Sequence, residues 1–169
     1  MNWMKWLALI VVVIILAPII AGQLGQLRGK APANLGLRDG RLKPPSKTPN
    51  SVTSQANLWP DHEQRAYAQI APLSLIKAGT GADAGAAIMA KLRQVVLAMP
   101  GARIVRDQDD YLHATFETRL LRFTDDAEFW LDSANGVVQV RSASRLGRRD
   151  FDVNRARIEA IRQAMAGGA

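Results

Sequence analysis

The residues best suited to chemistry are arginines that lie close together near the C-terminus. From Arg141 to Glu159 the chain reads RSASRLGRRDFDVNRARIE. This stretch joins a predicted strand to a predicted helix, and the N-terminus of a helix favours an anion through its unpaired N–H groups and its dipole. The sequence therefore predicts a site for a phosphate, a carboxylate or an anionic lipid at this junction. Its residues would be Arg141, Arg145, Arg148, Asn154 and Arg155.

The same residues support a second interpretation, in which the arginines brace the fold and bind no ligand. Three residues of the preceding strand would support either arrangement: Asp126, Glu128 and Trp130. In the brace, Arg145 pairs with Asp126. Arg141 lies on the ring of Trp130. Asp150 or Asp152 caps the helix. The sequence leaves both interpretations open, and neither identifies a reaction.

Carboxylates and histidines elsewhere give weaker signals. Cysteine is absent and the two histidines, His62 and His113, are distant in sequence, so we expect no metal site and no thiol chemistry. The acids at 125–128 can balance the arginines, and those at 107–110 are typical of a solvated turn. A Ser-His-Asp triad built on Ser142 or Ser144 would need a nucleophile elbow, which the sequence does not contain.

The segment GTGADAG, residues 79–85, has some likeness to a dinucleotide-binding fingerprint. Alanine stands in place of the third glycine, and no series of alternating strands and helices comes after it. We therefore interpret the segment as the loop that enters a helix, and we expect no cofactor.

The N-terminal segment is apolar. Residues 7–22 carry no charged side chain, Trp3 and Trp6 precede them, and the uncharged stretch continues to Leu27. About twenty such residues can cross a bilayer as one helix. We predict one N-terminal transmembrane helix that anchors the protein, within residues 1–27, with a cleaved signal sequence as the alternative.

The charges beside this segment bear on its orientation. Lys5 precedes it, whereas Arg28 and Lys30 come after it, and the positive-inside rule would place the domain in the cytoplasm. A single N-terminal anchor nevertheless often exports the domain to which it is joined. The charges therefore leave the side of the membrane open.

The excess of basic residues also suggests classes of partner. The formal charge is +7 and the isoelectric point is about 10.4, which raises nucleic acid as a candidate. The cations gather instead in residues 28–47 and around Arg141, without the interleaved aromatic side chains of a nucleic-acid surface. We expect the membrane as a partner, and no nucleic acid.

Residues 28–58 are rich in Gly, Pro, Ser and Lys and predict a tether. Its later part could dock on the domain as a short edge strand around Val52. Residues 59–169 predict one α+β domain, most simply a twisted antiparallel sheet with helices packed on one face. One helix would run from its N-cap Asp83 to Pro100, and a closing helix from about Asp152 to Gly167.

Strands are predicted at 102–106 and 111–118, and a hairpin comes after them. Asn135-Gly136 is the strongest short signal for a hairpin turn, because both residues tolerate the positive φ of a type I′ turn. Such a turn pairs Ala134 with Val137, which sets Trp130 opposite Arg141 and Asp126 opposite Arg145. One face of the hairpin is then apolar, and the other is a ladder of acids, arginines and a tryptophan.

Four segments carry a resemblance to a known family: PNSVTSQA (49–56), YLHATF (111–116), FTDDAEFWLD (123–132) and VRSASRLGRRDFDVNRARIEAIR (140–162). The chain resembles the domain of unknown function 1499. The resemblance implies a domain that is often preceded by a signal sequence or a membrane anchor in bacteria. We therefore expect a protein of the bacterial inner membrane whose domain faces the periplasm. The family has no established activity, so no catalytic residue is carried over. Ser51 stands where many members have cysteine, and Asp152 where glycine is common.

These observations favour a membrane-anchored envelope protein that binds an anionic small molecule, a lipid headgroup or an envelope protein, and is not an enzyme. The alternative is an envelope enzyme acting on a phosphorylated or carboxylated substrate, with Asp126 or Glu128 as the acid-base group. A structural or assembly protein without a ligand is a third possibility. The sequence leaves the ligand and the oligomeric state open.

Overall fold

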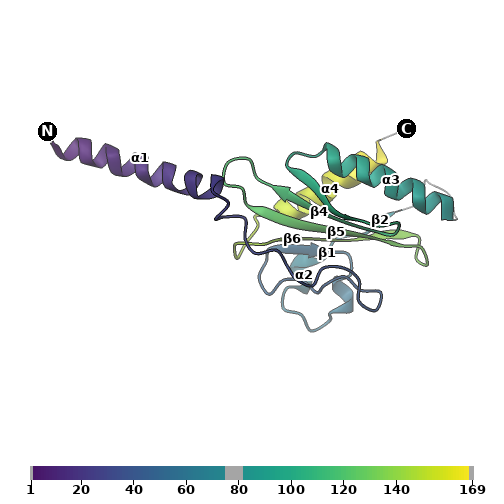
Figure 1. Cartoon of the computed structure of the whole chain (residues 1–169). Helices are drawn as coiled ribbons and strands as arrows, with labels where there is room; N and C mark the ends of the chain where they lie inside the picture. The colour runs from purple at the N-terminus through teal and green to yellow at the C-terminus, as the bar shows by residue number, and fades with distance from the viewer. Residues whose placement is uncertain (1, 75–81, 168–169) are drawn as a thin grey trace.

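The computed structural model describes residues 2–74 and 82–167, and within them six antiparallel strands form one sheet (Figure 1). The strand order is β1-β6-β5-β4-β3, and β2 pairs with β6 beside β1. The strands are β1 (Ser51–Thr53), β2 (Leu73–Ser74), β3 (Ala102–Asp107), β4 (Tyr111–Glu117), β5 (Thr124–Asp132) and β6 (Val137–Ser144). The helices are α1 (Asn2–Gln23), the 3-10 turn η1 (Ala56–Leu58), α2 (Arg65–Ala68), α3 (Ala82–Ala98) and α4 (Val153–Ala166). The predicted α+β class is confirmed.

Helices α3 and α4 cover one face of the sheet, as Figure 1 shows, because each carries an apolar stripe at helical spacing. Leu92 of α3 and Ile158 of α4 are fully buried against strand residues such as Phe129. Burying a side chain of this size stabilises the fold by about 1.5–3 kcal/mol. Val52 of β1 belongs to the same core, so the predicted edge strand is confirmed.

The ends of the two helices differ in detail from the prediction. α3 begins at Ala82, so Asp83 lies in its first turn and the prediction of Asp83 as the N-cap is wrong. The predicted entry loop at 79–85 lies partly outside the described residues, which omit 75–81. α4 begins after Phe151 and Asp152, whose φ angles are +51° and +64°. This left-handed backbone explains why glycine suits position 152, and Asp152 makes no side-chain cap.

The predicted register of the β5–β6 hairpin is wrong by two residues. Asp132, not Ala134, pairs with Val137, so the turn contains four residues. The Asp132 carboxylate accepts hydrogen bonds from the backbone N (3.2 Å) and Nδ2 (2.8 Å) of Asn135, and only Gly136 has a positive φ. Because side chains alternate with a period of two, a shift of two leaves the predicted faces unchanged.

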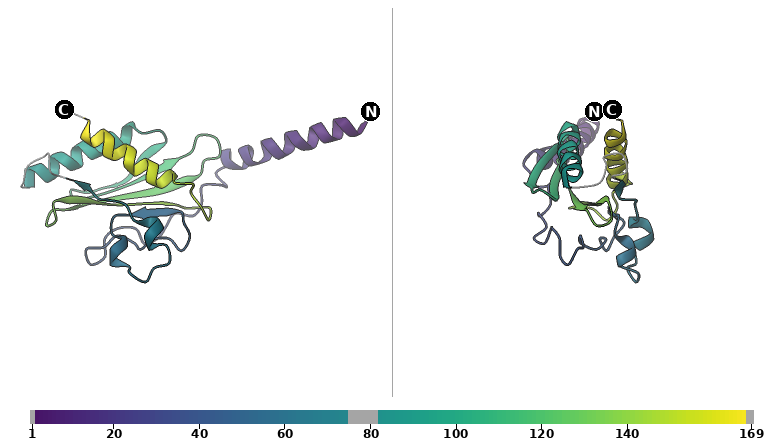
Figure 2. Two further views of the ribbon diagram at one scale, coloured as in Figure 1. Left: turned by 180° about the vertical axis from the view of Figure 1, so that it is seen from behind. Right: turned by 90° about the vertical axis from the view of Figure 1, so that its right-hand side faces the viewer.

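The face of the sheet opposite the helices is covered by the chain between α1 and α2 (Figure 2). Leu42 in this chain is 1% exposed, and its backbone N donates to Gln55 Oε1 (2.7 Å). The backbone N of Gly36 donates to Glu128 Oε1 of β5 (2.8 Å). Much of the stretch predicted as a tether, 28–58, therefore lies on the sheet and encloses its polar face.

α1 leaves one end of the sheet and points away from the domain (Figures 1 and 2). Most of its 22 residues are apolar, Gly22 near its C-terminal end is its one buried residue, and the helix spans about 33 Å at 1.5 Å per residue. This length matches the hydrocarbon core of a bilayer, about 30 Å. Length and composition make α1 a candidate membrane span, and a signal sequence shares these features.

Candidate functional site

Asp126 is the centre of a buried charge cluster on the polar face of the sheet. Its side chain is 1% exposed, and Arg145 donates two hydrogen bonds to it, Nε to Oδ2 (2.7 Å) and Nη2 to Oδ1 (2.8 Å). His113 Nε2 lies 2.8 Å from Oδ1. Burial by itself raises the pKa of Asp126, but hydrogen bonds and charge from Arg145 and His113 outweigh it and hold the pKa below its usual value. Asp126 is therefore a paired, ionised carboxylate.

Glu128 lies beside Asp126 on the same strand and is fully buried. Its Oε1 accepts hydrogen bonds from the Tyr111 hydroxyl (2.7 Å) and from the backbone N of Gly36 (2.8 Å). Burial and the nearby Glu128 charge raise the pKa of Tyr111 well above its ordinary value, so the hydroxyl stays a donor. The other oxygen, Oε2, accepts no hydrogen bond and lies 3.6 Å from Arg141 Nη1. Glu128 thus joins the sheet to the covering chain while one of its oxygens is unsatisfied.

Arg141 faces Glu128 across the β5–β6 pair and is 6% exposed. Among the described residues its side chain donates one hydrogen bond, from Nε to the carbonyl oxygen of Pro44 (3.3 Å). Burial lowers the pKa of Arg141, although the Glu128 and Asp126 charges partly compensate. A guanidinium has five donor hydrogens, so Arg141 retains capacity for a further acceptor.

A pocket of about 350 Å³ opens beside these arginines, between β6 and the covering chain. Four cations line it, from both sides: Lys30, Lys43, Arg141 and Arg145. Asp126 is the one acid in the lining, and Ser46 is a polar neutral residue in it. The lining carries four positive charges against one negative, so it favours an anion with oxygen acceptors.

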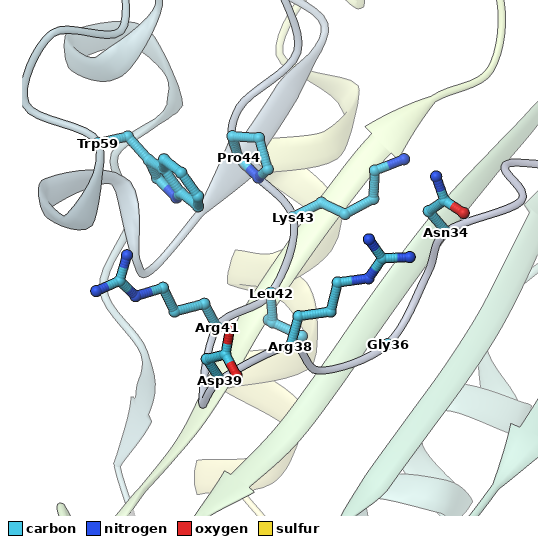
Figure 3. Close-up of a pocket in the computed structure, with 9 residues that line it drawn as sticks. All are labelled: Asn34, Gly36, Arg38, Asp39, Arg41, Leu42, Lys43, Pro44 and Trp59. Atoms are coloured by element: carbon cyan, nitrogen blue, oxygen red, sulfur yellow. The ribbon is translucent and has the colours of Figure 1, made fainter.

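A second pocket of about 480 Å³ adjoins the first, since Lys43 lines both (Figure 3). In Figure 3 the side chains of Arg38, Lys43 and Asn34 reach toward one another. On the other side, the Arg41 guanidinium lies 5.9 Å from the centre of the Trp59 ring. The lining of this second pocket therefore carries three cations, Arg38, Arg41 and Lys43, against the single acid Asp39.

A separate polar network lies on the helix side of the sheet, around the start of α4. Asn154 is fully buried; its Oδ1 accepts from Ser142 Oγ (2.6 Å) and Arg157 Nη1 (2.6 Å). Its Nδ2 donates to Asp150 Oδ2 (2.9 Å), and its backbone N donates to the same oxygen (3.2 Å). Asp150 therefore caps the helix, as the brace interpretation predicted. Arg157 also binds Asp125 (2.6 Å).

The five predicted anion-binding residues do not converge. Arg141 and Arg145 lie on the polar face, whereas Asn154 lies on the helix side. Arg155 is bound to the carbonyl oxygens of Tyr67 (2.5 Å) and Gln69 (2.9 Å), and Arg148 is exposed. Arg141 and Arg145 share a face because they lie an even number of positions apart along β6 and its end, whereas Asn154 and Arg155 belong to α4, which packs on the other face.

Two details of the brace interpretation have different outcomes. Arg145 pairs with Asp126 as predicted, although Asp126 lies opposite Ala143, because a long side chain can reach the diagonal neighbour. Arg141 does not lie on Trp130. The true register sets Trp130 opposite Gln139, and the tip of its ring approaches Gly40 of the covering chain.

The sequence analysis did not assign several residues to this site. Lys30 and Lys43 lie in the predicted tether, and Tyr111 and Arg157 were assigned only to a strand and a helix. The basic composition of residues 28–47 was the one available signal for the two lysines. As for metals, within residues 2–74 and 82–167 no group of three His, Asp or Glu side chains is placed to hold an ion.

Comparison with known proteins adds the family. No curated protein and no solved structure matches this chain. The family described as "Protein of unknown function (DUF1499)" matches residues 41–165, which include all six strands, α3 and all but the last residue of α4. The match begins within the chain that covers the polar face, and it covers most of the protein. The chain therefore belongs to the DUF1499 family.

Proposed function

We propose that the protein is a membrane-anchored envelope module whose periplasmic domain binds an anionic ligand bearing a phosphate or carboxylate group. One observation carries this proposal: the pocket between β6 and the covering chain is lined by four cations and one acid. Of the five residues predicted from the sequence, the proposed site keeps Arg141 and Arg145, and it adds Lys30 and Lys43.

The state of Arg141 supports an anion in this pocket. Its guanidinium is buried, but its ion-pair partner Glu128 is 3.6 Å away, a weak contact for a buried charge. A buried charge is costly unless it is closely paired and hydrogen-bonded. A phosphate or carboxylate oxygen in the pocket would accept the remaining Arg141 hydrogens and would also attract Lys43.

Thermal unfolding of the full chain in nonionic detergent tests this proposal. Inorganic phosphate and a soluble phosphate ester should raise the melting temperature, because a ligand at 100 times its Kd stabilises the native state by about 2.7 kcal/mol. Phosphatidylglycerol added to the micelles distinguishes a lipid headgroup from a free phosphate. Sodium chloride at equal ionic strength controls for screening.

Two lysine variants locate the binding. Lys43→Gln should lose most of the shift, and Lys47→Gln should keep it, since Lys47 is exposed and outside the pocket lining. Neither lysine makes a hydrogen bond or ion pair among the described residues, so both variants should remain folded. An equal shift in both variants, or an equal shift with chloride, would contradict the proposal.

The second candidate function is an envelope enzyme acting on a phosphorylated or carboxylated substrate. Glu128 Oε2 favours it, because a buried carboxylate oxygen without a hydrogen bond is unusual and marks Glu128 as the candidate acid-base group. Asp126 is a poor acid-base group, since Arg145 and His113 occupy both of its oxygens. Turnover of phosphate esters that Glu128→Gln abolishes, with binding retained, would favour the enzyme.

A further inference from the structure

Two loops lie at the end of the sheet from which α1 departs (Figure 1). One, residues 118–123, joins β4 to β5. The other, residues 145–153, leads from β6 into the first residue of α4. We call these two loops the rim. The pocket proposed above lies between β6 and the covering chain, so most of the rim is outside its lining.

The end of α1 is fixed to the first loop of the rim. Gln23 Nε2 donates hydrogen bonds to the carbonyl oxygens of Arg119 (3.3 Å) and Leu120 (2.9 Å). Gly22 packs so tightly that a Cβ there would lie 2.5 Å from the carbonyl oxygen of Leu121. This loop is therefore held at the level where α1 ends.

The second loop is held at the same level by the residues after α1. A Cβ on Gly29 would lie 2.7 Å from the Cβ of Arg145 and 2.9 Å from Cγ of Leu146. Arg28 Nε binds Glu117 at the end of β4 (2.8 Å). Wherever α1 emerges from a bilayer, both loops of the rim must lie close to that surface.

The rim concentrates exposed apolar side chains. Among the described residues after Leu24, eight large apolar side chains are exposed, and five of them lie in the rim. These five are Leu120, Phe123, Leu146, Phe151 and Val153. Isolated exposed apolar residues are ordinary, but a group of them on one surface indicates an interaction site.

Phe151 is the most exposed of the five, at 87%. Its φ of +51° lies in the left-handed region, which is unfavourable for a bulky side chain. The fold therefore accepts backbone strain at a residue whose ring makes little contact with the domain. Strain of this kind is often associated with function.

The same surface carries unpaired positive charge. Arg119, Arg148 and Arg149 are exposed, and their side chains make no ion pair or hydrogen bond within the described parts of the chain. Asp150 of the second loop is buried, whereas Asp152 is exposed and lies 3.9 Å from Arg155. The rim still carries five arginines against these two acids, so its net charge is positive. Apolar side chains flanked by free arginines suit the headgroup layer of an anionic membrane.

The geometry points to the rim as a surface that docks on an anionic bilayer. Leu120 and Phe151 enter the boundary between headgroups and acyl chains, and the three arginines bind lipid phosphates. This inference rests on α1 spanning the membrane, which is part of the proposed function, but not on the anion pocket. Docking would fix the height and tilt of the domain above the bilayer.

Fluorescence quenching in vesicles tests the inference with the full chain. The chain has no cysteine, so a single introduced cysteine can carry an environment-sensitive fluorophore. Ile10→Cys reports insertion of α1, Phe151→Cys reports the rim, and Leu58→Cys, also exposed but in η1, is the control. Spin-labelled lipids in vesicles containing phosphatidylglycerol should quench positions 10 and 151 but not 58.

Three outcomes would overturn the inference. Quenching at position 10 with none at 151 would leave α1 as an anchor and refute docking, which would favour a protein partner for the rim. No quenching at position 10 would remove the membrane span and the docking together. Equal quenching at 151 in pure phosphatidylcholine vesicles would exclude selectivity for anionic lipids.

A charge-reversed variant tests the arginines. Each basic residue near an anionic surface changes the docking equilibrium roughly fivefold, so Arg148→Glu with Arg149→Glu should lower the ratio of docked to undocked domain by at least about 25-fold. Quenching at position 151 should then fall toward the level of position 58, while position 10 stays quenched. Unchanged quenching at 151 would show that these arginines do not contact the lipid.

Discussion

Replacing Arg145 by Met should destabilise the domain strongly and in a pH-dependent way. Asp126 is 1% exposed and Arg145 is 13% exposed, so the substitution leaves a buried carboxylate with His113 as its remaining partner. Removing one member of a buried pair costs about 3–5 kcal/mol. We expect about 3 kcal/mol, because the guanidinium keeps some contact with solvent.

The sign of the pH dependence is set by Asp126. In the native protein its pKa is held below the ordinary value, so the pair stabilises the fold above about pH 4 and this stability is lost as the pH falls through the folded pKa. In Arg145→Met burial still raises the pKa of Asp126, but of the two groups that lower it only His113 remains. Asp126 then takes up a proton more readily, so the difference between the two proteins should shrink from about pH 7 to about pH 4.

Urea unfolding of the full chain in detergent micelles, followed by circular dichroism, measures the effect. With a slope of about 2 kcal/mol per molar, the midpoint should fall by roughly 1.5 M at neutral pH. Arg93→Met is the matched control: its partner Asp107 is exposed, and such pairs contribute less than about 1 kcal/mol. Equal midpoints for the two variants, or a difference independent of pH, would refute the reasoning.

Three further changes probe other parts of the fold. Gly101→Ala should lower the melting temperature by several degrees, because φ is +71° and the new Cβ would lie 2.1 Å from the carbonyl oxygen of Glu117; an unchanged melting temperature would contradict this. Leu42→Ala should cost about 2–5 kcal/mol in urea unfolding and speed tryptic cleavage of the covering chain, whereas a loose tether would show neither effect. The Tyr67 hydroxyl binds Asp150 (2.5 Å), and burial, followed by this bond, raises the pKa of Tyr67 to about 12. The stability that protonated Tyr67 contributes is complete below about pH 10 and is lost as the pH rises through 12. The melting temperature of Tyr67→Phe should therefore fall less than that of the native protein between these two pH values.

Local patterns predicted the elements of the fold well, because each depends on residues close in sequence. The apolar spacing of α3 and α4, the alternation of β4 and the two faces of the β5–β6 hairpin reflect periods of 3.6 and two residues. The hairpin register was wrong because Asp132 binds Asn135, and this side-chain contact selects a four-residue turn over the type I′ turn that Asn-Gly favours.

The candidate site was predicted only in part, for a different reason. Arg145 and Asp126 were paired correctly, since neighbouring strands bring them together. Lys30 and Lys43 could not be placed, because nothing local in a Pro- and Gly-rich chain states which surface it will cover. That depends on contacts such as Gly36 with Glu128, which are 92 residues apart.

The sequence by itself determined the apolar N-terminal helix, the α+β class, the family and the amphipathic faces of the sheet and helices. The helix, the fold class and the faces are set by composition and by short-range periodicity, and the family by the resemblance of four sequence segments. Only the tertiary structure decided that the predicted arginine cluster is divided between the two faces of the sheet, that the covering chain completes a basic pocket, and that the loops beside α1 form one surface. Each of these depends on strands and loops far apart in sequence, whose relative positions are fixed by packing and buried ion pairs and by no local signal.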